Sequence, residues 1–444
     1  MGKIVIIGGN HAGTAATNTI LGQYKDHEVT VIDRNSNMSY LGCGTALWVG
    51  EQIDGPENLF YSSKEKLTEA GAAVHMETEV QNIDFNNKVV TAMSKEGAKI
   101  EQPYDKLILA TGSLPIAPKI KGIDLENVHY VKLYQDGEKI HQALNSEDIQ
   151  TVAVIGAGYI GVELAEAVHR RGKKTFMFEA GSSILPGYYD EWFTADMDKH
   201  MKENGINIHL EERIEEIKGD GKVSGIVTNK GSYDVDMVIV SVGFMPNSKL
   251  GADVLETFPN GAYKVNLKQE TSMKDVYAIG DCATVYSNAL QDRAYIALAT
   301  NAVRSGIVGA HNACGTEIES AGVQGSNGIS IFGYNMVSTG LTVNGAKAAG
   351  FDVAYTEFED LQKPAFIKEG NHKVKIRIVY DKTSRRVLGA QLASFEDISM
   401  GIHMFSLAIA EKVTIDSLKL LDIFFLPHFN QPYNYITMAA LSAV

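Results

Sequence analysis

The chain has 444 residues, of which 45% are hydrophobic and 21% are charged, a composition typical of a soluble globular protein with a sizeable core. At about 150 residues per domain, this length predicts roughly three domains. There are 40 lysines and arginines against 54 aspartates and glutamates, and the net charge of −14 argues against nucleic acid or an anionic membrane as a default partner.

The N-terminus runs directly into a short apolar strand over residues 4–7, too short for the apolar region of a signal peptide. No stretch reaches 18 apolar residues, so no membrane span is expected. The three cysteines, Cys43, Cys282 and Cys314, are too few for a disulfide framework and show no CxxC spacing. These features predict a cytoplasmic protein with reduced thiols.

Residues 3–33 contain an apolar strand, a glycine-rich turn, a helix and a second apolar strand that ends on an acid. Residues 151–179 repeat this order. Each copy is a βαβ unit of about 30 residues, the context in which a glycine motif indicates dinucleotide binding. Two copies predict two dinucleotide sites in one chain.

The first copy departs from the usual pattern, because its turn over residues 8–13 reads GGNHAG and Asn10 replaces the middle glycine. Asparagine tolerates left-handed backbone geometry better than most residues, so we expect the turn to survive. Asp33 ends the second strand and provides the acid for a ribose.

Two apolar strands, at 104–113 and 236–243, each end in a turn of small residues where the chain could cross between domains. The segment 271–281, TSMKDVYAIGD, then places Asp281 just beyond a strand end. A carboxylate in this position suits the hydroxyl of a sugar alcohol.

The second copy has the full fingerprint, in which Gly156 allows the tight turn, Gly158 admits a pyrophosphate and Gly161 lets the helix pack on the strand. Amide groups at the helix start hold the phosphate. Glu179 ends the second strand and can bind a ribose diol. No arginine follows Glu179 at Ala180 to neutralise a 2′-phosphate, so the pattern favours NADH over NADPH.

The two fingerprints, the ATGS turn at 110–113 and the VYAIGD segment resemble, in this order, the pyridine nucleotide-disulfide oxidoreductase family of flavoproteins. The resemblance covers essentially the whole chain and implies an α/β fold with two Rossmann-like dinucleotide-binding domains, arranged as in glutathione reductase, plus a C-terminal α+β dimerisation domain. Residues 372–393 fit a hairpin of that last domain, with its turn at Asp381 and Lys382. The implied domains are an FAD-binding domain in two parts, 1–117 and 245–322, an inserted NADH-binding domain, 118–244, and an interface domain, 323–444.

The resemblance also assigns cofactor residues. In the family the first βαβ unit binds FAD, the second binds NADH, and the acid of VYAIGD holds the flavin ribitol. The implied FAD residues are Gly8, Asn10, His11, Ala12, Gly13, Asp33, Cys43, Val80, Ala110, Thr111, Gly112, Ser113, Lys132, Asp281, Leu298, Ala299 and Thr300. The implied NADH residues are Gly156, Gly158, Tyr159, Ile160, Gly161, Glu179, Tyr188 and Gly243, with Tyr159 as a gate that covers the flavin until nicotinamide displaces it.

Cys43 distinguishes the chain from the disulfide reductases of the family, which carry two cysteines about five residues apart in this region. Within residues 39–48, small residues break the pattern around Cys43 and an apolar run opens what looks like a helix. A thiol at a helix start has a lowered pKa. A lone thiolate can cycle through sulfenic acid if reduced flavin returns the electrons. Cys282 and Cys314 are expected to be structural.

The GGNHAG turn and the lone cysteine are similar to the branch of the family that contains NADH oxidases and NADH peroxidases. In that branch a histidine lies beside the cysteine sulfur, which makes His11 a candidate hydrogen-bond donor and general acid. Residues 39–49, 298–317 and 423–441 look like the water-forming NADH oxidases of lactic-acid bacteria. The same likeness implies a homodimer in which Phe425 and His428 lie near the partner's flavin and cysteine.

The expected reaction is the oxidation of two NADH by O₂ to give two waters, with Cys43 reducing the peroxide formed on the way. Three alternatives remain open. NADH peroxidase would share every named residue, whereas a coenzyme A-disulfide reductase would need a basic path that residues 35–38 do not provide. A flavin redox sensor, in which oxidised Cys43 signals to a partner, would have no need for the intact second fingerprint.

Overall fold

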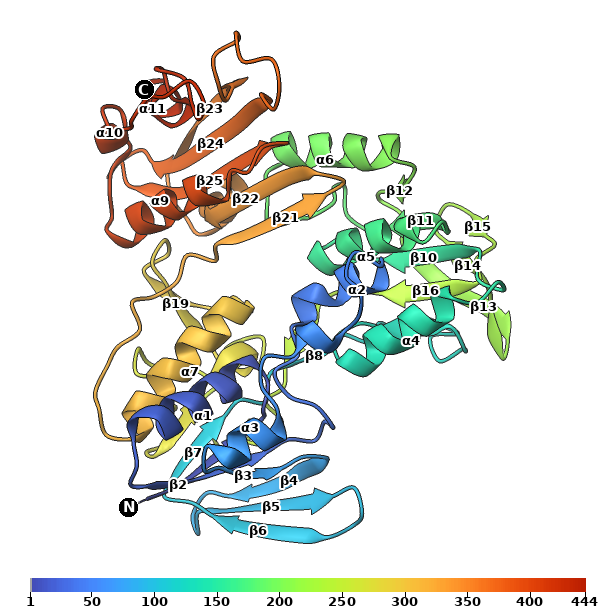
Figure 1. Ribbon diagram of the computed structural model, residues 1–444, viewed down its shortest axis with the longest axis vertical. Coiled ribbons are helices and arrows are strands. Elements are labelled where there is room, and N and C mark those ends of the chain that lie inside the picture. Colours follow the sequence, from blue (N-terminus) through green and yellow to red (C-terminus); the bar gives the residue numbers. More distant parts are fainter. Residues whose placement is uncertain (1) are drawn as a thin grey trace.

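The computed structural model describes residues 2–444 and contains three sheet units, which we call the N-terminal, middle and C-terminal units (Figure 1). The N-terminal and middle units are each built on a five-stranded parallel sheet, and the C-terminal unit on a five-stranded antiparallel sheet. The predicted α/β fold class, with two dinucleotide-type units and a C-terminal α+β unit, is confirmed. The exact boundaries at 117, 244 and 322 stay predictions.

The N-terminal unit has the strand order β18-β7-β1-β2-β3. Its first strand, β1, is an apolar run with buried residues on both faces, as expected for a strand inside a parallel sheet. Its parallel strands are β1 (Gly2–Ile7), β2 (His27–Ile32), β3 (Ala73–His75), β7 (Lys106–Leu109) and β18 (Val276–Ala278). Around them lie α1 (His11–Gln23), α3 (Lys64–Glu69), α7 (Ala299–Ala313), the antiparallel β4 (Thr78–Asp84), β5 (Val89–Ser94) and β6 (Lys99–Pro103), and the hairpin β19 (Val285–Ser287) and β20 (Asp292–Ala294). The short α2 (Thr45–Val49) instead packs on the helices of the middle unit (Figure 1).

The middle unit repeats the arrangement with the strand order β12-β11-β10-β16-β9. Its elements are β9 (Val128–Tyr130), α4 (Tyr134–Leu144), β10 (Thr151–Ile155), α5 (Tyr159–Arg170), β11 (Lys174–Phe178), α6 (Glu191–Glu203), β12 (Asn207–His209), β13 (Ile214–Asp220), β14 (Lys222–Thr228), β15 (Ser232–Tyr233) and β16 (Met237–Val240). Because β18 of the N-terminal unit follows this whole unit in the chain, the middle unit is an insertion.

The two connections between these units lie side by side. The outgoing β8 (Ser113–Pro115) pairs antiparallel with the returning β17 (Phe244–Pro246). They follow β7 and β16, the two strands whose small-residue ends were predicted as crossing points. This pairing brings the carboxyl ends of both parallel sheets toward the same region, where ligands bind in open α/β folds.

The C-terminal unit has the strand order β21-β22-β25-β24-β23. Its elements are β21 (Asn327–Ile331), β22 (Tyr334–Gly340), α8 (Val343–Ala348), β23 (Val353–Leu361), β24 (Lys373–Asp381), β25 (Val387–Ser394), α9 (Ser399–Ala410), α10 (Ile415–Leu418) and α11 (Tyr435–Leu441). The predicted hairpin is the β24–β25 pair, closed by the hydrogen bond from the Arg385 amide to the Asp381 carbonyl.

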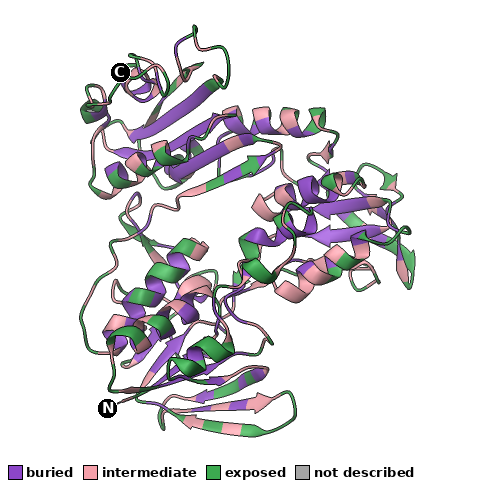
Figure 2. Ribbon diagram, in the orientation of Figure 1, coloured by how far each residue is buried: buried purple, intermediate pink, exposed green. Residues whose placement is uncertain are grey.

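Buried residues follow the central strands of all three units, whereas the outer helix faces are exposed (Figure 2). The apolar core of the middle unit continues into the C-terminal unit, because Ile329 and Met336 join the cluster that contains Val154 and Phe193. No helix within residues 2–444 has the length and apolar character needed to cross a membrane.

Candidate active site

The two glycine-rich turns are built in the same way. The Gly8 amide donates to the Ile32 carbonyl at 2.9 Å, and the Gly156 amide donates to the Phe178 carbonyl at 2.8 Å. Gly8 and Gly156 have φ angles of +107° and +97°, a backbone region that favours glycine. The replacement of the middle glycine by Asn10 therefore leaves the first turn intact.

The third glycine of each turn lets a helix approach its strand. A Cβ atom at Gly13 would lie 1.8 Å from the Gly8 carbonyl oxygen, and a Cβ atom at Gly161 would lie 1.9 Å from the Gly156 carbonyl oxygen. Both contacts involve backbone atoms, which cannot rotate away as a flexible side chain would. The amide groups at the starts of α1 and α5 thus face the turns, as a bound pyrophosphate requires.

Each strand-end acid is held against its own turn. The Gly9 amide donates to the Asp33 carboxylate at 2.5 Å, and the Ala157 amide donates to the Glu179 carboxylate at 2.9 Å. Asp33 is 7% exposed, yet both of its oxygens accept a backbone N–H. The two acids keep oxygen lone pairs toward the turn, where a ribose diol would lie.

Three of the predicted FAD residues meet although they lie far apart in the chain. Ser113 Oγ donates to the Asp281 carboxylate at 2.9 Å, and Lys132 Nζ reaches Ser113 Oγ at 2.8 Å and Asp281 at 3.3 Å. Asp281 lies in the short 3₁₀ helix Gly280–Cys282 that follows β18. This charged, hydrogen-bonding group suits a polyol chain that bridges the two units.

The remaining predicted FAD residues surround the carboxyl ends of β1, β2 and β7. Val80 is buried on β4 in the cluster that contains Ile7 and Ile32, and the Ala110 amide donates to the Ile7 carbonyl. Leu298 precedes α7, which packs against α1. Together with the turn and the charged group, the structure places around this sheet edge Gly8, Asn10, His11, Ala12, Gly13, Asp33, Val80, Ala110, Thr111, Gly112, Ser113, Asp281, Leu298, Ala299 and Thr300.

The predicted NADH residues gather at the start of α5 and at the end of β16. Tyr188 packs edge-on against the Tyr159 ring, with their centroids 4.7 Å apart, and is 41% exposed. Gly243 has a φ of +111° and follows β16. The group consists of Gly156, Gly158, Tyr159, Ile160, Gly161, Glu179, Tyr188 and Gly243.

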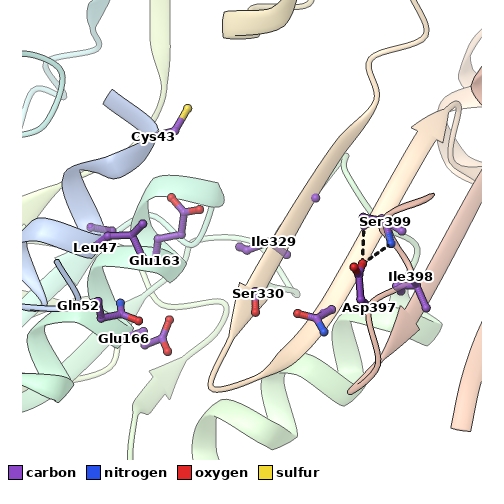
Figure 3. A pocket seen from close by; sticks show the side chains of 14 residues that line it. Cys43, Leu47, Gln52, Glu163, Glu166, Ile329, Ser330, Asp397, Ile398 and Ser399 are labelled. Atoms are coloured by element: carbon purple, nitrogen blue, oxygen red, sulfur yellow. Dashed lines mark hydrogen bonds between the residues drawn. The ribbon is translucent and has the colours of Figure 1, made fainter. Parts of the chain in front are cut away.

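Cys43 lies on the wall of a cavity of about 350 Å³ between the N-terminal, middle and C-terminal units (Figure 3). Its side chain stands at one end, with Glu163 of α5 beside it and Ile329 and Asp397 of the C-terminal unit across the cavity. Glutamate, aspartate and neutral side chains line the cavity, and no lysine or arginine is among the lining residues of the described chain. Small neutral molecules fit this cavity better than anions do.

The predicted low pKa of Cys43 is wrong for this chain by itself. Burial and the neighbouring Glu163 carboxylate raise the pKa of the Cys43 thiol, while a backbone hydrogen bond and Lys132 lower it by less. The predicted helix does follow, but α2 has only five residues, so the amide groups at its start contribute little. Lys132, from the middle unit, is the cation that favours a thiolate here.

Glu163 was missed by the sequence analysis. It lies one helical turn after Tyr159 on α5, so both side chains lie on the same side of the helix. Burial and the neighbouring Glu166 raise the pKa of Glu163 to about 7. The spacing of four residues from the fingerprint tyrosine is a signal that could have identified it.

His11 begins α1, and its Nδ1 lies 2.9 Å from the Tyr61 hydroxyl, with the two rings nearly parallel. Burial lowers the pKa of His11, and Asp281 and Lys132 are the charged groups that act on it next. Asp281 and Lys132 also act on Cys43, which places His11 and Cys43 in one electrostatic neighbourhood. The pairing with Tyr61 had no signal in the sequence.

Comparison with known proteins follows the same division of the chain. The family described as pyridine nucleotide-disulphide oxidoreductase matches residues 2–306, and its dimerisation domain matches residues 328–434. The chain belongs to the pyridine nucleotide-disulphide oxidoreductase family. The resemblance found in the sequence is thereby confirmed.

Relatives within this oxidoreductase family share most of their length with the chain. An NADH oxidase from Streptococcus pyogenes serotype M6 is 59% identical, with all of both chains covered. An NADH oxidase from Lactococcus lactis is 58% identical over 99% of this chain and 100% of its own. The solved structure of a water-forming NADH oxidase from Lactobacillus brevis, bound to NADH, is 36% identical with a TM-score of 0.96, covering 100% of this chain and 98% of its own.

Phe425 and His428 lie within the range that matches the oxidoreductase dimerisation domain. Both are exposed in the irregular segment between α10 and α11, and neither lines the Cys43 cavity of its own chain. Phe424 and Phe429 of this segment are also exposed, at 67% and 57%. Their place near a partner's active site stays a prediction.

Proposed function

We propose that the chain is an FAD-dependent NADH oxidase that reduces O₂ by four electrons to water, in the reaction 2 NADH + 2 H⁺ + O₂ → 2 NAD⁺ + 2 H₂O. The observation that carries the proposal is Cys43, with no second cysteine beside it, on the wall of a cavity that has acidic and neutral lining residues, in a chain that also has two intact dinucleotide turns. The names of the Streptococcus, Lactococcus and Lactobacillus relatives support the same assignment. An acidic cavity disfavours the phosphates of coenzyme A, and so disfavours the disulfide reductase alternative.

The residues of the first turn fit FAD. The α1 amide groups would hold its pyrophosphate, Asp33 its ribose, and the group formed by Ser113, Lys132 and Asp281 its ribitol. When bound, FAD supplies two-electron transfer between NADH and an oxidant. The second turn and Glu179 would hold NADH in the same manner, with Tyr159 at the entrance to the flavin.

Cys43 is the proposed catalytic residue for the second half of the reaction. Its thiolate attacks hydrogen peroxide formed in the site, the O–O bond breaks, and the products are a Cys43 sulfenic acid and, after proton uptake, one water. Two electrons from the second NADH and one proton then convert the sulfenic acid to thiolate and a second water. Cys43 has no second cysteine with which to form a disulfide, because Cys282 is fully buried and Cys314 caps α7.

His11 is the proposed hydrogen-bond donor for this step. Because burial lowers its pKa, the imidazole is neutral near pH 7, and a neutral imidazole carries a single N–H. We assign that hydrogen to Nε2, with the Tyr61 hydroxyl donating to Nδ1. The arrangement leaves an N–H available for the oxygen that departs from peroxide.

The proposed assembly is a homodimer in the cytoplasm. The exposed aromatic residues around Phe425 are a surface that a second copy of the C-terminal unit would cover, bringing Phe425 and His428 to the partner's cavity. Three free cysteines and the use of NADH suit a reducing compartment.

The stoichiometry of the holoenzyme in aerated buffer tests the proposed function. We expect close to two NADH consumed for each O₂, with little hydrogen peroxide detected in the same sample. A ratio of one with an equal amount of peroxide would contradict four-electron reduction. A negligible oxygen rate that rises sharply when peroxide is added would instead identify an NADH peroxidase.

Gly13 gives a direct test of the FAD turn. Gly13→Ala places a Cβ 1.8 Å from the Gly8 carbonyl oxygen, so we expect the turn to open and the purified protein to lose most of its flavin. The matched control is Gly22→Ala in the same helix, where a Cβ meets no atom within 4 Å. The control should keep its flavin and gain up to about 1 kcal/mol in stability. Flavin absorbance per protein and thermal unfolding measure both effects, and full flavin content in Gly13→Ala would disprove this role.

A further inference from the structure

Tyr159 lies at the start of α5, where the proposed NADH site requires nicotinamide to pass. The pyrophosphate of NADH would bind at the start of α5, and Glu163, one turn further along, lines the cavity beside Cys43. Tyr159 is the first residue of α5 and lies on the same side of the helix as Glu163. Its side chain therefore lies between the pyrophosphate position and the reaction cavity.

The Tyr159 hydroxyl is not free in this conformation. It donates a hydrogen bond to the Asn327 side-chain oxygen and lies 2.7 Å from the Tyr189 hydroxyl. Burial raises the pKa of Tyr159, so the hydroxyl keeps its proton and remains a donor. Moving the ring out of the nicotinamide path breaks the hydrogen bond to Asn327 and separates the two tyrosine hydroxyls.

Asn327 comes from a different sheet unit than the tyrosine that it binds. It is the first residue of β21 in the C-terminal unit, 168 residues after Tyr159. Its side-chain amide donates to the Gly325 carbonyl at 2.8 Å, and Ser338 Oγ donates to its oxygen at 3.1 Å. The amide group is therefore fixed from two sides before it meets Tyr159.

Tyr189 strengthens the same anchor. It is 4% exposed, and its hydroxyl donates to the Met336 carbonyl at 3.0 Å and lies 3.2 Å from the Asn327 oxygen. Asn327 and Tyr189, the two residues that contact the Tyr159 hydroxyl, are thus both held by the β21–β22 pair of the C-terminal unit. Asn327 belongs to β21, and Tyr189 donates to Met336 of β22. The C-terminal unit contributes an acceptor to an element of the NADH turn.

We propose that Asn327 is a positioning residue that holds Tyr159 across the nicotinamide path in the nucleotide-free enzyme, so that the C-terminal unit sets how readily nicotinamide enters. This inference rests on the proposed binding of NADH at the α5 turn. A protein whose binding-competent state is partly populated shows a weaker apparent affinity, in proportion to that population. Removing the Asn327 acceptor destabilises the closed position and raises the population of the open one.

The test uses Asn327→Ala in the FAD-loaded enzyme, with NAD⁺ as the probe because it binds without turnover. Loss of one hydrogen bond from the closed state predicts an NAD⁺ dissociation constant about two- to tenfold lower than in the wild type, measured by titration calorimetry. In anaerobic stopped flow, the NADH concentration for half-maximal flavin reduction should fall by the same factor. The limiting reduction rate should change less than twofold, because the gate is already open at saturation.

We call the hydrogen bond between Tyr159 and Asn327 the latch. Three further variants distinguish loss of the latch from a general loss of packing. Asn327→Asp keeps an acceptor oxygen for Tyr159, although it loses the donor to the Gly325 carbonyl, and should bind NAD⁺ no more tightly than the wild type does. Ser338→Ala removes a hydroxyl that helps to fix the same Asn327 oxygen but leaves the acceptor for Tyr159 in place, and should raise the NAD⁺ affinity less than Asn327→Ala does. Tyr159→Phe combined with Asn327→Ala should bind no more tightly than the tighter single variant, because both remove the same hydrogen bond.

Unchanged or weaker NAD⁺ binding in Asn327→Ala would overturn the proposal, as would tighter binding of equal size in Ser338→Ala. The experiments also distinguish a failure of the proposed oxidase function from a failure of the latch proposal. If the wild type binds NAD⁺ but forms no water from O₂, the function is wrong, and the affinity difference between wild type and Asn327→Ala still decides the latch.

Discussion

Cys43→Ser is expected to convert a water-forming enzyme into one that releases peroxide. The serine hydroxyl occupies nearly the same space, so flavin content and NADH oxidation should persist. It cannot form a nucleophile comparable to a thiolate near neutral pH, and the peroxide is left unreduced. The ratio of NADH to O₂ should fall from near two to near one, with about one hydrogen peroxide released per NADH.

Neither of the other cysteines can replace Cys43. Cys282 is fully buried, and its single S–H lies between the Leu109 and Ile279 carbonyl oxygens, which are 3.3 and 3.2 Å from the sulfur. Burial raises the pKa of Cys314, at the end of α7, to about 12. Cys314→Ala is therefore the control, and it should keep the ratio near two. If Cys43→Ser still produced only water, Cys43 would not be the group that reduces peroxide.

The parts of the site that were predicted well are those encoded within about 30 consecutive residues. The turns at Gly8 and Gly156, and the acids Asp33 and Glu179, belong to local βαβ units in which glycine spacing and strand length determine the geometry. The first turn forms although Asn10 replaces the middle glycine, because the positive φ angle falls on Gly8 and not on Asn10.

The parts that failed depend on residues brought together from distant segments. Helix position alone predicted a low pKa for Cys43, but the sulfur also faces Glu163, which lies 120 residues away on the inserted middle unit. The contact of Tyr159 with Asn327 joins residues 168 positions apart. Local patterns carry no information on such pairs, since tertiary packing determines which charges and acceptors meet.

The contact between Tyr61 and His11 also could not be predicted from the sequence. Ser39 has a left-handed φ of +58°, and its hydroxyl exchanges two hydrogen bonds with the Ser62 backbone. This clamp holds the segment before Cys43 against residues 59–62 and brings Tyr61 to His11. A serine in a left-handed conformation costs free energy, and such positions gather at functional sites. Nothing in the sequence around Ser39 distinguishes it from an ordinary loop serine.

Replacing Glu179 is expected to reverse the choice between NADH and NADPH. Glu179 is held at the end of β11 by the Ala157 and Gly181 amides, so its charge is fixed where the adenosine ribose would lie. A carboxylate there accepts hydrogen bonds from the 2′- and 3′-hydroxyls of NADH and repels the 2′-phosphate of NADPH. Hydrogen bonds to a charged group are worth about 1.5–3 kcal/mol, or about 10- to 100-fold in kcat/KM.

The double variant Glu179→Ala and Ala180→Arg removes the repulsion and adds a cation for the phosphate. Its ratio of kcat/KM for NADPH to that for NADH should rise by about 10³-fold over the wild type, the combined effect of one lost and one gained charge-assisted interaction. Glu215→Ala, an exposed glutamate on β13 of the same unit, is the control for a general change in charge and should leave the ratio unchanged. An unaltered ratio in the double variant would show that the ribose lies elsewhere. Because the flavin and Cys43 belong to other elements, the water-forming stoichiometry should be the same with either nucleotide.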